Sequence, residues 1–83
     1  MNMMQIAGLF ENFIPSYACR ATSAAQGFIT LQFDSRVTRG TQFTLRGISL
    51  ERVADERAIH LLSQTLSDEF ALVRAGMHRQ PRF

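Results

Sequence analysis

Two short stretches decide the fold: residues 28–34 read FITLQFD and residues 41–47 read TQFTLRG. Apolar and polar side chains alternate in both, and this period of two is typical of a strand with one buried face. The apolar positions, which share one face, are Ile29, Leu31, Phe33, Phe43 and Leu45. The polar positions, which share the other, are Thr30, Gln32, Gln42, Thr44 and Arg46. The pattern predicts two antiparallel strands joined through residues 35–40.

A third strand is predicted over residues 17–23, where the alternation is weaker. Because an unpaired arginine is costly to bury, Arg20 should point to water. Side chains alternate along a strand, so Tyr17, Cys19 and Ala21 should then point to the core. The short turn over residues 24–27 makes this strand the antiparallel neighbour of residues 28–34. The three runs predict a meander with one buried and one wet face.

Helical patterns flank the strands on both sides. Residues of about 3–13 repeat apolar positions every three or four residues, with Asn2 as a possible N-cap and Pro15 preventing continuation. A longer helix is predicted to begin after Asp55 and to end at Gly76. Both helices must cover the single apolar face of the sheet. The expected fold is an α+β two-layer sandwich in the order helix-strand-strand-strand-helix, with both helices on one face of a three-stranded antiparallel meander.

The chain length limits the domain organisation. Its 83 residues, 46% of them hydrophobic, suffice for one small core. We expect a single domain over residues 1–76 and a disordered basic tail over residues 77–83. The N-terminus shows no targeting signal, and no run approaches the roughly 18 apolar residues of a membrane span. The expected protein is soluble, cytoplasmic and without membrane contact.

Nucleophilic and metal chemistry find little support in the sequence. A catalytic cysteine needs a histidine within hydrogen-bonding distance, but Cys19 is expected in the core and His60 on the polar side of the second helix. His78 lies in the expected tail. One cysteine and two histidines show no zinc spacing, and no phosphate loop or nucleophile elbow occurs. We therefore expect no enzymatic activity, no cofactor and no metal site.

Among the acidic residues, Glu69 has the least obvious structural role. On the helical wheel it falls within the wide apolar face, between Leu62 and Leu72. A carboxylate there must pair with an arginine or a backbone N–H at the rim, reach for water, or face an oligomer partner. By contrast, Asp34 ends a strand and is expected to accept hydrogen bonds from the turn backbone.

The basic residues allow an anion-binding alternative. All nine are arginine, which suits phosphate and carboxylate, although codon bias in a G+C-rich genome gives the same composition. A possible anion patch on the wet face and its neighbouring loop comprises Arg20, Arg36, Arg39 and Arg46. Double-stranded-RNA-binding domains share the element order, but here the second helix begins with Asp55 and Glu56, which repel phosphate. Weak nucleic-acid or anion binding is therefore the alternative function.

A protein-interaction or homo-oligomeric module is the favoured function. Three strands leave two open sheet edges, which invite pairing with another chain. Leu61 and Leu72 also widen the apolar face of the second helix beyond what one small sheet covers. The partner is either a second copy or another protein.

Several short motifs lie between about residues 5 and 73: residues 9–15 (LFENFIP) with Cys19 shortly after, Gly47-Ile48, residues 57–59 (RAI), Leu66 and Glu69. In these the chain resembles a group of small bacterial proteins, domain-of-unknown-function family 1652. The resemblance implies an α+β fold with no assigned activity, and it transfers no functional residues. Members of that family often carry a second cysteine near the first. This chain has only Cys19, which weakens any metal or redox role.

Overall fold

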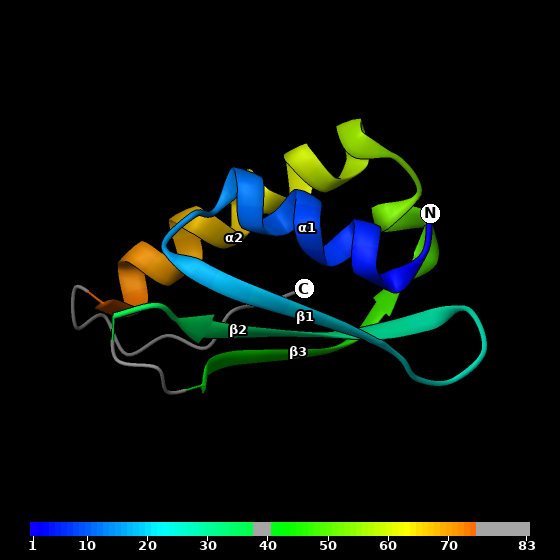
Figure 1. The fold of residues 1–83 in the computed structure, drawn as a ribbon, viewed down its shortest axis with the longest axis horizontal. Helices are drawn as coiled ribbons and strands as arrows, with labels where there is room; N and C mark the ends of the chain where they lie inside the picture. Colours follow the sequence, from blue (N-terminus) through cyan, green and yellow to red (C-terminus); the bar gives the residue numbers. More distant parts are fainter. Residues whose placement is uncertain (38–40, 75–83) are drawn as a thin grey trace.

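The computed structural model of the protein describes residues 1–37 and 41–74. The elements are α1 (Met3–Phe13), β1 (Tyr17–Ser23), β2 (Phe28–Ser35), β3 (Thr41–Ser49), a short 3-10 helix η1 (Leu50–Val53) and α2 (Glu56–Arg74). Figure 1 shows both helices on the same side of the sheet. The predicted α+β sandwich and its element order are confirmed, whereas η1 was not predicted.

The sheet has the strand order β1-β2-β3, with antiparallel neighbours. Cys19 lies opposite Phe33, which in turn lies opposite Phe43. Tyr17 is buried and Cys19 is half-buried, whereas Arg20 is exposed. The predicted phase of the first strand is therefore correct.

Both helices begin at the predicted N-caps. Asn2 and Gln5 form a capping box, in which the Asn2 side chain accepts from the Gln5 N–H at 2.8 Å and the Gln5 side chain accepts from the Asn2 N–H at 2.9 Å. The Asp55 carboxylate accepts from the Ala58 N–H at 2.8 Å. These bonds satisfy amides that the first helical turn leaves without a partner. The predicted helix end at Gly76 and the tail over residues 77–83 lie outside the described residues.

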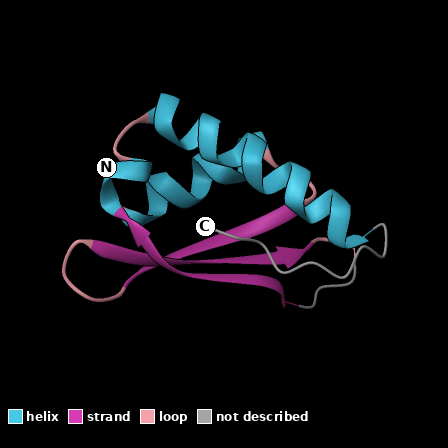
Figure 2. Ribbon diagram, turned by 180° about the vertical axis from the view of Figure 1, so that it is seen from behind, coloured by secondary structure: helices cyan, strands magenta, loops and turns pink. Residues whose placement is uncertain are grey.

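An aromatic cluster joins α2 to all three strands. The Phe70 ring stacks on Phe43 of β3, with centroids 3.8 Å apart, and meets Phe33 of β2 at 5.2 Å. Tyr17 of β1 lies 5.2 Å from the same ring. α1 packs over β1, and α2 lies beside it on the β3 side, as the two opposite views show (Figures 1 and 2). Phe70 thus anchors α2 above the middle of the sheet.

The third strand continues past its predicted end at residue 47 by means of a bulge. Between the pairs Leu31–Leu45 and Ile29–Ile48, two residues of β3 stand where β2 has one. One of them is Gly47, whose φ of +72° lies in the left-handed region that favours glycine. The extra residue shifts the alternation, so that Leu45 and Ile48 are both buried although they are three positions apart.

Candidate interaction surface

Cys19 lies in β1 beneath α1, and its surroundings disfavour the ionised thiolate form. Burial raises the pKa of this thiol to about 12, and the negative charges of Glu11 and Asp34 contribute to the increase. A thiol with this pKa stays protonated near neutral pH and is a poor nucleophile. The His60 ring stacks on Phe13 of α1, with centroids 4.6 Å apart. The other histidine, His78, lies outside the described residues.

The hydrogen-bond pattern of β1 shows which of its amides face away from the sheet. The backbone N–H of Arg36 donates to the Ser16 carbonyl at 3.2 Å, and the backbone N–H of Ala24 donates to the Phe28 carbonyl at 3.1 Å. Hydrogen-bonded pairs alternate along an antiparallel ladder. The even-numbered residues of β1 therefore bond to β2, and the N–H and C=O groups of its odd-numbered residues point outward.

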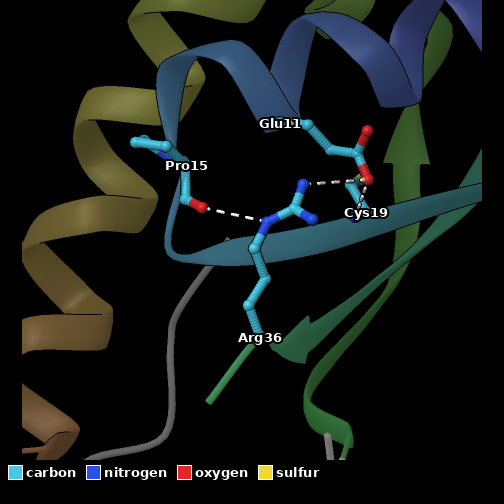
Figure 3. Close-up of polar contacts among 4 residues, drawn as sticks. All are labelled: Glu11, Pro15, Cys19 and Arg36. Carbon is cyan, nitrogen blue, oxygen red and sulfur yellow. Dashed lines mark hydrogen bonds and ion pairs between the residues drawn. The ribbon is translucent and has the colours of Figure 1, made fainter.

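Glu11 covers part of this outer edge (Figure 3). One oxygen of its carboxylate accepts from the outward-facing Cys19 N–H at 3.0 Å and lies 3.6 Å from the Arg36 guanidinium. Arg36 also donates through Nε to the Pro15 carbonyl at 3.0 Å. The bridge, which was not predicted from the sequence, ties α1 and the turn after it to the outer side of β1.

The two edges of the sheet differ in their cover. At the start of β1, the outward Tyr17 N–H donates to the Ile14 carbonyl at 3.1 Å, beside the bond from Cys19 to Glu11. At the other edge, Thr44 stands opposite Gln32, whose backbone bonds to β1, so the N–H and C=O of Thr44 point outward. Within residues 1–37 and 41–74 these two groups have no hydrogen-bond partner. In the described part of the protein the start of β1 is therefore covered, whereas the outward groups of Ala21 and Ser23 at its end and of Thr44 on β3 are open.

The flank of α2 that faces away from its contact with α1, and so lies on the β3 side, carries exposed apolar side chains. The inner stripe of the helix, which includes Leu62, Leu66 and Phe70, is buried. Leu61 and Leu72 stay 58% and 38% exposed, so the predicted excess of apolar surface is present and the sheet does not cover it. Between η1 and α2 an open cavity of about 250 Å³ is lined by Arg52, Ala58, Leu61, Leu62 and Thr65.

Two charged side chains lie on the same flank. Glu69 is half-buried, and Arg52 on η1 is exposed. Neither side chain forms an ion pair or a hydrogen bond with the described residues. Of the three placements expected for Glu69, pairing at the rim is not formed, which leaves water or a partner. We refer to Thr44, Arg46, Arg52, Leu61, Thr65, Glu69 and Leu72 together as the edge–flank surface.

The four arginines of the predicted anion patch separate in the structure. Arg20 and Arg46 are exposed on β1 and β3. Arg36 turns towards α1, where it contacts Glu11 and Pro15. Arg39 lies outside the described residues. Asp34 also differs from its expected role, because its carboxylate accepts from the Gln32 side chain at 3.2 Å, while the turn amide of Val37 bonds to Ser35 Oγ.

A polar groove of about 410 Å³ lies between the end of α1 and α2. It is lined by Phe13, His60, Ser63, Gln64, Ser67 and Asp68. Ser63 is 2% exposed, and its hydroxyl oxygen is itself buried without a hydrogen-bond partner. Because that oxygen does not reach the surface of the groove, it offers no contact to a ligand.

No group of three or more metal-ligating side chains occurs in the described segments, and no helix there is long and apolar enough to cross a bilayer. Comparison of the chain with protein-family models, curated proteins and solved structures finds no match. The resemblance to family 1652 therefore stays a prediction.

Proposed function

We propose that the protein is a non-enzymatic interaction module that binds a protein partner through the edge–flank surface. The observation that carries the proposal is that β3 is open beside the exposed flank of α2, whereas the start of β1 is covered. Glu11 and the turn after α1 occupy outward amides of β1, whereas Thr44 on β3 has no partner in the described structure. A strand edge with free N–H and C=O groups is a template for an added strand.

The helix above this edge supports the same function. Main-chain hydrogen bonds at an open edge hold any extended segment, and side-chain contacts add affinity and selectivity. Leu61 and Leu72 provide apolar area beside the edge, while Arg52 and Glu69 provide charges without partners. An added strand on β3 therefore meets both an apolar and a charged surface on α2 and η1.

Amide hydrogen exchange measured by NMR tests the proposal in the dilute protein. The Cys19 amide should be protected by Glu11, and the Thr44 amide should exchange at close to the rate of an unstructured peptide. Strong protection of Thr44 in the dilute monomer contradicts the proposal, because the edge is then already occupied by the protein's own chain.

The alternative function, weak nucleic-acid or anion binding, retains Arg20 and Arg46 on the open sheet face. Binding that weakens steeply with salt, and that is lost in an Arg20→Gln, Arg46→Gln variant, supports this alternative instead. We further propose a cytoplasmic location, which fits the unpaired thiol of Cys19, since disulfides are rare in the cytosol.

A further inference from the structure

We infer that the partner of the edge–flank surface is a second copy of this chain, placed so that the two β3 strands join in one continuous six-stranded sheet. This inference rests on the proposed function and adds the identity of the partner. A two-fold axis perpendicular to the sheet pairs identical strands antiparallel and keeps both α2 helices on the same face. It also makes the two helices run antiparallel to each other.

The strand register follows from the groups that point outward. Thr44 and Arg46 alternate with Leu45, whose backbone faces β2. If the axis passes through Leu45, Thr44 of one copy exchanges backbone hydrogen bonds with Arg46 of the other. The two Leu45 side chains then meet beneath the helices. Within one copy Leu45 is already buried, with 7% of its surface exposed.

This register brings the exposed leucines of α2 together. α2 runs opposite to β3 (Figure 1), and Phe70 marks the level of Phe43 by stacking on it. Since a helix rises about 1.5 Å per residue and a strand about 3.3 Å, the helical position level with Leu45 is close to residue 66. A two-fold axis there places Leu61 of one copy at the level of Leu72 of the other.

Charge complementarity favours a second copy over an unrelated strand. The axis places Glu69 of one copy near the level of residues 61–65 of the other, where Arg52 lines the cavity beside Leu61 and Thr65. On this surface each copy offers two cations, Arg46 and Arg52, and one anion, Glu69, that have no partner among the described residues, and the symmetry brings Arg52 and Glu69 together at both sites.

Sedimentation velocity and light scattering over a wide concentration range test the inference. The wild-type protein should form a dimer, and protection of the Thr44 amide should rise with concentration. Thr44→Pro removes an outward N–H and should abolish the dimer, since proline is tolerated on an unpaired edge but cannot donate to a neighbour. Ser23→Pro is the matched control, because the Ser23 N–H faces outward on β1, and this variant should still form the dimer.

A charge exchange tests the predicted pairing directly. Arg52→Glu or Glu69→Arg alone places like charges in contact at both symmetric sites and should weaken the dimer by about tenfold. The double variant Arg52→Glu, Glu69→Arg should restore dimerisation, which a merely structural role of either residue does not predict. Circular dichroism establishes that each variant is folded, and the charge exchange decides the matter if Thr44→Pro unfolds the protein.

The outcomes separate this inference from the proposed function. A monomer at millimolar concentration with a freely exchanging Thr44 amide overturns the second copy as partner but leaves the open edge for another protein. A monomer with a protected Thr44 amide overturns both. A dimer that Thr44→Pro and the charge exchange leave unchanged overturns the inference, because another surface then forms the contact.

Discussion

The raised pKa of Cys19 predicts the rate at which the native protein reacts with an alkylating reagent. The thiolate is the reacting species. At pH 8 a thiol with the ordinary pKa of 9.0 is about one-tenth ionised, and a thiol with a pKa of about 12 is about one ten-thousandth ionised. Each unit of pKa changes the ratio of the two forms tenfold, so native Cys19 should react about a thousandfold more slowly than the unfolded chain.

Iodoacetamide in large excess, with labelled protein counted by mass spectrometry, measures this rate. The reference is the same chain in concentrated urea at the same pH. The native rate should keep rising about tenfold per pH unit between pH 9 and 11, whereas the unfolded chain levels off above pH 9. A native rate within tenfold of the unfolded rate at pH 8, or a plateau near pH 9, contradicts the prediction, because Cys19 is then neither desolvated nor covered by α1.

Glu11→Gln separates the causes of the raised pKa. Burial is the largest cause and the Glu11 charge the second, so the variant should react faster than wild type but far more slowly than the unfolded chain. The folded-state pKa of the thiol lies above its unfolded value. Its contribution to the free energy of unfolding is therefore complete below about pH 9 and is lost as the pH rises towards 12. Cys19→Ala should remove this alkaline dependence.

Five further substitutions test the fold itself, with the free energy of unfolding measured by urea denaturation. Phe70→Ala should lower the free energy of unfolding by about 3–5 kcal/mol, because this buried ring contacts all three strands, whereas the exposed Phe28→Ala should change it by less than about 1 kcal/mol. Gly47→Ala should lower it by about 1–2 kcal/mol, because φ is +72° there. Gly8→Ala inside α1 should raise it by about 0.5–1 kcal/mol, since apart from its chain neighbours and the backbone of its own helix no atom lies within 4 Å of the added Cβ. Glu11→Ala should lower the free energy of unfolding by about 1–3 kcal/mol and speed hydrogen exchange at the Cys19 amide. An unchanged exchange rate at that amide would show that Glu11 does not cover the β1 edge.

Most of the fold was predictable from local patterns. Alternation fixed which side of β2 and β3 faces the core, and the cost of burying Arg20 set the phase of β1. Asn2 and Asp55 marked the helix starts because their side chains accept from free amides of the first turn. Gly47 was the exception, since strand alternation alone does not show that a glycine will form a bulge and extend the strand to Ser49.

The candidate surface was predictable only in outline. Two open edges and an excess of apolar residues on the second helix followed from the strand count and the positions of Leu61 and Leu72. The bridge from Glu11 to Cys19 and Arg36 did not, because it joins residues 8 and 25 positions apart through the packing of α1 on β1. For the same reason, Arg36 was assigned to the anion patch although it turns towards the helix.

Periodicity, caps and turn residues are properties of neighbouring positions, and they determined α1, α2, the three strands and the buried face of the sheet as far as Leu45. The difference between the two sheet edges depends on how a helix lies over a strand, and it therefore arises from tertiary packing. α1 rests on β1, so the Glu11 carboxylate reaches the outward amide of Cys19, while the corresponding groups of Thr44 on β3 lie beyond the reach of the described helices. Local sequence therefore specified a sheet with two equal edges, and the packing of one helix made them unequal.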